Sequence, residues 1–192
     1  MKTIEKEAVI TFEEKKSKFI GYIKPVSEKY DAEAFIKKIK DKHSDANHNC
    51  SVYKVVDNGQ EFFKVDDDGE PSGTAGKPMG DIVTYMGVSN LVIVATRYFG
   101  GIKLGAGGLI RNYAKIAKLS IQKSGIIEYV KMKKYILEFP YDKIGEVDSV
   151  LSYNSIENIE KGYNENVIYK LELNERVLNQ IKEITGILIV EL

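Results

Sequence analysis

One stretch, Asn90 to Tyr113, constrains the fold of this chain more than any other. It opens with the apolar run Leu91–Ala95, whose length and β-branched content favour a buried strand over a helix. Beyond the glycines that follow, apolar residues recur at helical spacing from Leu109 to Ala117. The glycines between these two patterns are Gly100, Gly101, Gly105, Gly107 and Gly108. The sequence therefore predicts a strand, a glycine-rich turn and a helix start in direct succession.

This succession suits the binding of an anion. The first N–H groups of a helix have no partner within it, and the helix dipole adds positive potential at the same point. Four basic side chains accompany the glycines, and they are Arg97, Lys103, Arg111 and Lys115. Glycines also serve tight turns and close main-chain packing, which require no ligand. Both roles stay open, although five glycines in nine positions exceed the need of one turn.

Known nucleotide-binding patterns do not fit this loop. It lacks the G-x-x-x-x-G-K-[ST] pattern of a Walker loop, and GGIKLGAGGL does not supply G-x-G-x-x-G. We therefore expect no bound cofactor.

The charge of the chain is balanced but unevenly distributed. The formal net charge of the 192 residues is zero, which argues against a purely electrostatic binder of nucleic acid. No acidic residue occurs between Asp81 and Glu128, whereas six basic residues fall there. From Lys131 onward, acidic residues outnumber basic ones. The front of the chain is thus mildly positive and the tail mildly negative.

Three observations bear on the compartment. Cys50 is the single cysteine, so no internal disulfide can form and a reducing environment is expected. The charged N-terminal segment shows no secretory signal. No apolar run approaches the roughly 20 residues of a membrane span. We expect a cytoplasmic protein with no membrane partner.

An earlier loop, between Asp66 and Gly76, is rich in carboxylates and small residues. We call it the first loop and the glycine-rich turn between Gly100 and Gly108 the second loop. The candidate polar residues of the first loop are Asp67, Asp68, Glu70, Ser72 and Thr74. The carboxylates could form a Mg²⁺ or Ca²⁺ cluster, act as an acid–base pair, or line a solvated turn, but their spacing does not match an EF-hand. We favour a fourth interpretation, in which they pair with Arg97 or Lys103 across a cleft. EPSGTAG is not a G-x-S-x-G nucleophile elbow, so no catalytic residue is assigned.

Other polar and aromatic residues leave alternatives open. His43, His48 and Cys50 are spaced H-x4-H-x-C, which matches no strong zinc pattern. We expect packed, hydrogen-bonded side chains there and no metal site. Tyr98 and Phe99 could stack on nucleobases or cover an edge of the core.

The remaining pattern predicts further strands and helices. The predicted strands of the front part are Glu7–Phe12, Ser17–Lys24, 52–56 and Gln60–Val65, with a hairpin turn at Asp57-Asn58-Gly59. Asp31 is the expected N-cap of an amphipathic helix. For the tail we predict strands Lys133–Phe139, Ser155–Lys161, Val167–Leu173 and Ile187–Leu192, helices Tyr141–Leu151 and Glu175–Thr185, and a turn at Gly162–Asn164. This order, βαββαβ, is the split arrangement of ferredoxin-like domains.

Two long segments resemble the paired signature of the IMPACT family. They are DDGEPSGTAGKPM (Asp67–Met79) and RYFGGIKLGAGGLIRNY (Arg97–Tyr113). The segment HSDANHNC (His43–Cys50) is also similar to that family. The resemblance covers essentially the whole chain, and the tail is similar to the extra domain of the bacterial, YigZ-like members.

The resemblance implies an α+β fold in two domains, 1–130 and 131–192. The first would be similar to domain IV of elongation factor G and to the βαβ fold of GHMP kinases. The second would be similar to the ferredoxin-like last domain of elongation factor G. This double likeness implies contact with RNA or the ribosome. Eukaryotic relatives regulate translation by competing for a kinase activator, partly through a domain absent here. The family defines no catalytic residues.

We therefore expect a non-enzymatic, translation-linked protein that binds RNA or another phosphate-bearing partner through a basic, glycine-rich cleft. One alternative is an enzyme acting on a phosphorylated small molecule or nucleotide, in which Asp67, Asp68 or Glu70 binds Mg²⁺ or accepts a proton. Another alternative is a protein–protein module that captures an acidic peptide in the same cleft, and this would be a protein partner in translation control.

Overall fold

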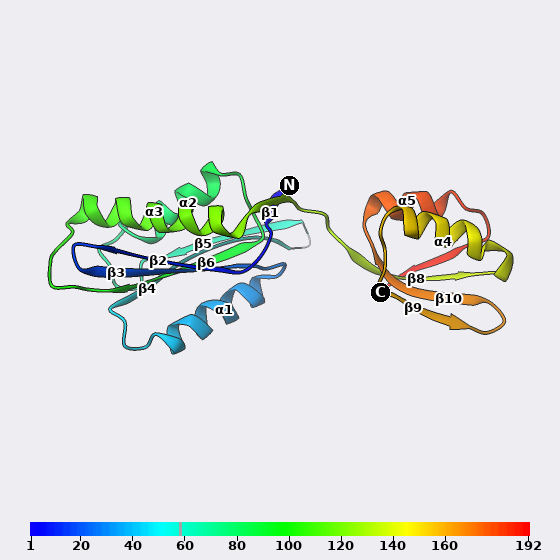
Figure 1. The fold of residues 1–192 in the computed structure, drawn as a ribbon, viewed down its shortest axis with the longest axis horizontal. Helices are drawn as coiled ribbons and strands as arrows, with labels where there is room; N and C mark the ends of the chain where they lie inside the picture. The colour runs from blue at the N-terminus through cyan, green and yellow to red at the C-terminus, as the bar shows by residue number, and fades with distance from the viewer. Residues whose placement is uncertain (58) are drawn as a thin grey trace. The chain divides into compact units, whose positions relative to one another are not determined.

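A computed structural model describes residues 1–57 and 59–192. The chain forms two compact units, Met1–Tyr129 and Val130–Leu192, and each is described by itself. Figure 1 shows the helices and strands of both units. Within the described ranges, no helix has both the length and the apolar character that crossing a membrane requires.

The first unit is built on a five-stranded sheet in which every neighbouring pair of strands is antiparallel. The spatial order of the strands is β2-β3-β6-β4-β5. Their bounds are Ala8–Glu14 (β2), Ser17–Pro25 (β3), His48–Asp57 (β4), Gln60–Asp66 (β5) and Leu91–Tyr98 (β6). The strand predicted at the opening of the central stretch is thus β6, and it lies in the middle of the sheet.

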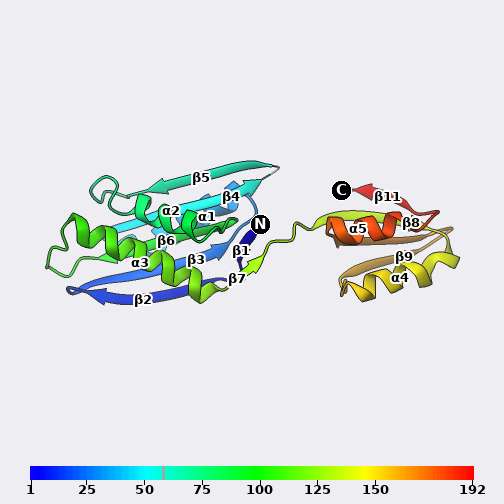
Figure 2. The same cartoon turned by 90° about the horizontal axis from the view of Figure 1, so that it is seen from above.

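Helices cover both faces of this sheet (Figures 1 and 2). Helices α2 (Gly76–Tyr85) and α3 (Ala106–Ser124) lie on one face, and α1 (Lys29–Lys42) lies on the other. Strand β6 is buried by both layers, because Leu91, Ile93 and Ala95 belong to the core under α2 and α3. Val92 and Val94 belong to the core under α1. Burial on both faces explains why this strand is apolar at successive positions and shows no alternation.

Two short strands complete the first unit. Strand β1 (Lys2–Ile4) pairs with β7 (Ile126–Glu128) in a separate antiparallel sheet. The predicted pattern contained no strand at the N-terminus, because three residues are too few for an alternation to be recognised. Only the partner strand, which follows the end of α3, makes this pairing possible.

Several boundaries differ from the prediction. Helix α1 begins at Lys29 with Glu28 at the N-cap position, so the prediction that Asp31 caps it is wrong. Asp31 instead lies in the first turn, where a carboxylate is favourable to the helix dipole. Strand β2 continues through Glu14, which leaves only Lys15 and Lys16 for the turn into β3. Of the predicted turn at Asp57-Asn58-Gly59, Asn58 lies outside the described residues.

The second unit contains strands and helices in the order βαββαβ, with a 3-10 turn before its first helix. The strands are β8 (Lys133–Phe139), β9 (Ile159–Tyr163), β10 (Val167–Leu173) and β11 (Leu188–Glu191), and the helices are α4 (Ile144–Tyr153) and α5 (Glu175–Lys182), after η1 (Tyr141–Lys143). The antiparallel sheet has the order β11-β8-β10-β9. Apolar residues of both helices pack with the inward residues of the strands in one core.

Two details of this unit correct the prediction. Strand β9 begins at Ile159 rather than Ser155, and Gly162 and Tyr163 lie within it, so the turn falls on 164–166. Ser155 adopts a positive φ of 55° at the end of α4, which is incompatible with a strand at that residue.

His43, at the end of α1, is fixed by hydrogen bonds to two tyrosine hydroxyls, one of which is also bonded to Asp45. Its Nδ1 lies 2.8 Å from the Tyr98 hydroxyl, and its Nε2 lies 2.6 Å from the Tyr22 hydroxyl. The Tyr98 hydroxyl donates to Asp45 Oδ1 at 2.9 Å, so it accepts a hydrogen bond from His43 Nδ1. His43 Nε2 then accepts from Tyr22. The neutral ring satisfies this whole chain of hydrogen bonds.

We predict that acidification destabilises the first unit through His43. Burial, followed by the charge of Lys42, lowers the pKa of His43. Because the pKa of His43 is lower in the folded state, the neutral ring contributes to the free energy of unfolding above about pH 6.5. This contribution is lost as the pH falls through the folded-state pKa. The free energy of unfolding of this unit should therefore drop between about pH 7 and pH 5, and drop less in His43→Gln. Urea denaturation followed by hydrogen-exchange mass spectrometry measures each unit separately, and equal drops in both proteins would contradict the prediction.

Candidate functional site

The two signature segments meet through the carboxylate of Glu70. Glu70 lies in the loop between β5 and α2, and its Oε1 accepts from Arg97 Nη1 at 2.6 Å and from the Tyr113 hydroxyl at 2.8 Å. Arg97 is near the end of β6, and Tyr113 is in the second turn of α3. One carboxylate thus joins the first loop to the strand and the helix of the second. The predicted pairing of a carboxylate with Arg97 is confirmed, and at this contact the two segments are closed against each other.

Arg97 is buried, with only 6% of its surface exposed. Its guanidinium lies 5.9 Å from the ring centre of Phe19 and 5.5 Å from that of Phe99. With its charge paired to Glu70, Arg97 is not a free surface cation. The structure gives no support to the interpretation of Arg97 as a phosphate contact, because a phosphate would have to displace Glu70 to reach its guanidinium.

Asp67 occupies the start of α2. Its carboxylate accepts from the main-chain N–H groups of Gly73 at 2.8 Å, Ala75 at 3.0 Å and Gly76 at 2.8 Å. Gly76 is the first residue of α2 and Ala75 its N-cap, so two of these donors belong to the helix start, where an anion is favourable. The anion at α2 is therefore a side chain of the protein itself.

The other polar residues of the first loop also stabilise it. Asp68 accepts from Lys40 Nζ at 2.6 Å and from the Asn49 N–H at 2.6 Å. Thr74 is buried, and its hydroxyl donates to the Pro71 carbonyl at 2.6 Å. Ser72 is exposed on the loop. Most of the residues predicted to line a cleft thus hold the loop in place.

His43, His48 and Cys50 do not converge. His48 Nδ1 donates to the Asp68 carbonyl at 2.9 Å, and its Nε2 lies 3.7 Å from Glu70 Oε2. The buried Cys50 thiol donates to the Asp67 carbonyl, and burial raises its pKa. Within residues 1–57 and 59–192, no three His, Cys, Asp or Glu side chains are arranged to hold a metal ion.

The start of α3 is open, unlike that of α2. Gly105 occupies the N-cap position without a side-chain cap, and the first turn carries no acidic residue. Gly101, Lys103, Gly105 and Gly107 are exposed, whereas Gly108 is buried against Leu104. Earlier in the loop, the N–H of Phe99 donates to Asn47 Oδ1 at 2.7 Å. The outer part of this loop and the helix start therefore face solvent.

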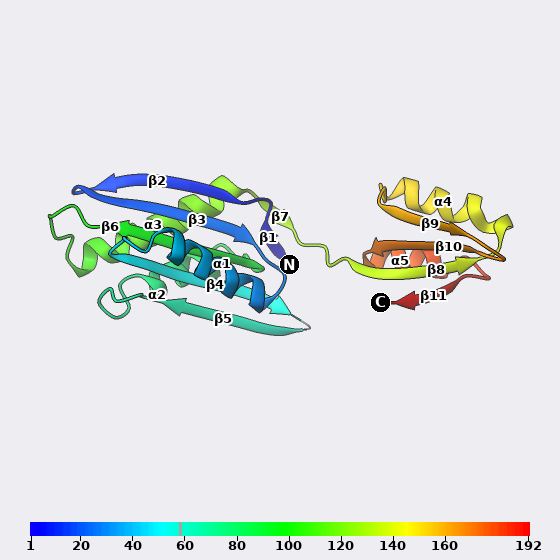
Figure 3. The same cartoon turned by 90° about the horizontal axis from the view of Figure 1, so that it is seen from below.

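Gly100 has a role in folding. A Cβ atom at this position would overlap the carbonyl group of Lys16, in the turn between β2 and β3. Lys15 and Lys16 both have positive φ, 47° and 63°, as a two-residue type I′ hairpin turn requires. Figure 3 shows this hairpin and the loop before α3 at the same end of the sheet. Sequence reasoning did not include the two lysines, because no local signal reveals that their turn packs on Gly100.

Exposed cations of the hairpin turn, of the loop before α3 and of α3 itself are together named the basic surface. It consists of Lys15 and Lys16 from the hairpin turn, Lys103 from the loop, and Arg111, Lys115 and Lys118 from α3. None of these six side chains forms an ion pair within the described part of the chain. Lys115 Nζ lies 4.3 Å from the ring centre of Phe12 on β2.

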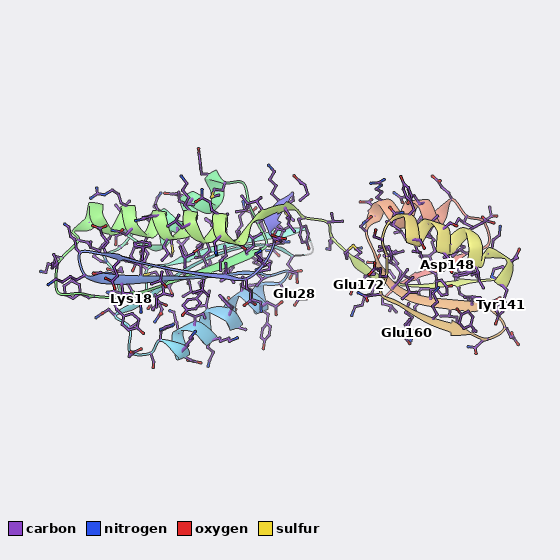
Figure 4. All side chains as sticks on the ribbon, in the orientation of Figure 1. Lys18, Glu28, Tyr141, Asp148, Glu160 and Glu172 are labelled. Atoms are coloured by element: carbon purple, nitrogen blue, oxygen red, sulfur yellow. The ribbon has the colours of Figure 1, made fainter. Side chains whose placement is uncertain are left out.

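Four acidic residues of the first unit are already bonded, whereas Glu13 and Glu14, which directly precede Lys15 and Lys16, have no ion-pair partner in the described residues. Asp45 accepts from Tyr98, Asp66 and Asp68 pair with Lys40, and Glu70 pairs with Arg97. Lys18 follows the turn (Figure 4) but does not belong to the basic surface. On β3 it lies on the same face as Ile20 and Tyr22, which is the face toward α1.

We predict strong energetic coupling between Glu70 and Arg97. Glu70→Leu should destabilise the first unit by about 3–5 kcal/mol, because it leaves the Arg97 charge buried without a partner. Glu70→Leu combined with Arg97→Met should cost less than the single Glu70 change, since no charge remains. A double-mutant cycle from urea denaturation with hydrogen-exchange detection measures the coupling, and additive effects would contradict it.

Two glycines of the second signature segment should respond differently to an added Cβ. Gly100→Ala should destabilise the first unit by about 1–3 kcal/mol, because the added Cβ forces the Lys16 main chain away. Gly107→Ala should be neutral or stabilising by up to about 1 kcal/mol, since alanine favours the helix and the Cβ meets only the end of Arg111. The unfolding midpoints of the two variants test this, and a destabilised Gly107→Ala would contradict the assignment of an open position.

Comparison with known proteins agrees with the two signature segments. The sequence model of the Impact N-terminal domain matches residues 15–121, which include both glycine-rich loops. The chain is 39% identical over 168 residues to the IMPACT family member YvyE of Bacillus subtilis, covering 88% of this chain and 77% of that protein. It is 31% identical over 161 residues to the IMPACT family member YigZ of Escherichia coli, covering 83% and 78%.

A solved structure shares the fold over the whole length. A chain described as a hypothetical protein superposes with a TM-score of 0.66 at 24% identity, covering 100% of this chain and 96% of that one. From the domain match and the identity to these relatives, the chain belongs to the IMPACT family.

Proposed function

We propose that this protein is a translation-linked regulatory protein, without catalytic activity, that binds RNA or the ribosome through the basic surface. The observation that carries the proposal is the exposed start of α3, surrounded by cations that have no ion-pair partner in the described residues. The link to translation comes from the family, whose eukaryotic relatives regulate it. The binding chemistry comes from the surface itself.

The two helix starts of this region supply complementary arguments. At α2 the main-chain donors already hold the Asp67 carboxylate, so no external anion is needed there. At α3 the N-cap residue is Gly105, which has no side chain to accept such hydrogen bonds, and the first turn carries no acidic residue. A phosphate group can take that place, with Lys103 and Arg111 nearby to neutralise its charge.

The side chains available also bear on the enzymatic alternative. A kinase-like mechanism would need Asp67, Asp68 or Glu70 to bind Mg²⁺ or to accept a proton. Asp67 accepts three main-chain hydrogen bonds, Asp68 accepts from Lys40 and the Asn49 N–H, and Glu70 is buried in its pair with Arg97. Each carboxylate would have to leave contacts that hold the loop, which favours the binding function.

We predict that RNA binding depends on three cations of the basic surface and on salt. The triple variant Lys103→Ala, Arg111→Ala, Lys115→Ala should bind structured RNA and ribosomes more weakly than the unchanged protein. The slope of log affinity against log salt should become shallower by about 2 to 3, because each lost phosphate contact removes slightly less than one unit. Filter binding over a series of salt concentrations measures both quantities.

A control variant of equal charge separates a specific surface from the general charge of the protein. Lys2, Lys38 and Lys64 are exposed and form no ion pair in the described residues, and none belongs to the basic surface. Replacing these three by alanine should leave the affinity and the salt slope nearly unchanged. Equal losses in the two triple variants, or binding that is insensitive to salt, would refute the proposed surface.

A further inference from the structure

Phe99 is an exposed aromatic side chain held in a fixed position. Its exposed fraction is 43%, although it directly follows the buried strand β6. The buried guanidinium of Arg97 lies 5.5 Å from the ring centre of Phe99, and the main-chain N–H of Phe99 donates to Asn47 Oδ1. The next residue, Gly100, packs on the Lys16 main chain. The ring is therefore supported from within the protein and leaves part of its surface to solvent.

The neighbouring aromatic residue is not equivalent. The Tyr98 hydroxyl is bonded to both His43 and Asp45, and its ring packs with the core under α1. Of the two aromatic residues considered for base stacking, Phe99 is exposed, whereas Tyr98 is half-buried.

Lys16 lies close to the residue after Phe99, and further cations follow Phe99 along the chain. Lys16 starts beside Gly100, because a Cβ on Gly100 would meet the Lys16 Cβ as well as its main chain. Along the chain, Lys103 lies in the same loop, and α3 continues with Arg111, Lys115 and Lys118. From Arg111 to Lys118 the helix rises about 10 Å. The cations therefore extend over a greater length than a single phosphate group could contact.

We propose that the basic surface binds a single-stranded segment of RNA, with a base stacked on Phe99 and the flanking phosphates on Lys16 and the cations of α3. This inference rests on the function proposed above and specifies its ligand. A single strand offers unstacked bases beside a chain of negative charges, which matches an exposed ring accompanied by separated cations. A duplex hides its bases, and an acidic peptide has none, so neither uses Phe99 in this way.

The test compares three ligands of equal length by fluorescence anisotropy: a single-stranded RNA oligonucleotide, the same strand with abasic sites, and its duplex. The unchanged protein should prefer the single strand with bases. Phe99→Ala should weaken binding of that strand by about 5-fold to 150-fold, the range of one lost stacking contact. The same variant should leave binding of the abasic strand and the duplex nearly unchanged.

Matched variants separate stacking from charge and from misfolding. Phe99→Tyr keeps the ring and should bind like the unchanged protein. Tyr85→Ala removes an aromatic side chain of α2 that is 87% exposed and should have no effect. Lys16→Ala should weaken binding of all three ligands, whereas Lys18→Ala, on the α1 side of the same hairpin, should not. The unfolding midpoint of each variant confirms that it is folded.

Other results would overturn the inference. If Phe99→Ala weakens the binding of all three ligands equally, or if the duplex binds as tightly as the single strand, Phe99 does not stack on a base. The proposed function then stands, provided that the triple charge variant still loses RNA binding. If no RNA binds, or if only an acidic peptide binds, both the function and this inference are refuted.

Discussion

The buried contact of Glu70 with Arg97 and Tyr113 is the constraint on which the arrangement of this region depends. One carboxylate joins a loop, a strand end and a helix that are distant in sequence. A charge buried at such a place is costly unless its partners are fixed, so the three elements must hold one geometry. The same contact removes Arg97 from the surface and supports the Phe99 ring from beneath. It therefore determines which side chains of the second loop remain available to a partner.

The two glycine-rich segments, similar in composition, serve different purposes. In the first segment, Asp67 fills the helix start with its own carboxylate, and the main chain around Gly76 packs closely on Asp66. In the second segment, Gly100 packs on the hairpin turn, but Gly101, Gly105 and Gly107 face open space or only a side-chain end. Glycine thus allows close packing at the inner positions and exposes main-chain donors at the outer ones.

Under the proposed function, this division would make one short loop both structural and functional. The inner residues fix the hairpin, the strand end and the helix relative to each other. The outer residues then present cations and N–H groups on a rigid support, which lowers the entropy lost when a ligand binds. In such a design, affinity for a negatively charged partner depends on salt and on a few exposed side chains. The fold itself depends on the buried carboxylate.

Much of the fold follows from the sequence alone. The local spacing of hydrophobic residues predicts the buried strand β6, the amphipathic helices and the βαββαβ order of the tail. The boundaries were less determined, since Asp31 suits a helix start but tertiary packing begins α1 at Lys29. The sequence also indicated that a carboxylate of the first loop pairs with a cation of the second.

Only the tertiary structure decided which groups are buried and which are exposed. Arg97 and Lys103 are both basic residues beside glycines, yet one is enclosed between aromatic rings and the other faces solvent. Likewise, Lys16 joins the surface because its turn packs on Gly100, a contact between residues more than 80 positions apart. Local sequence determines the conformational preference of each segment. The burial of a charge depends on contacts that only the folded chain brings together.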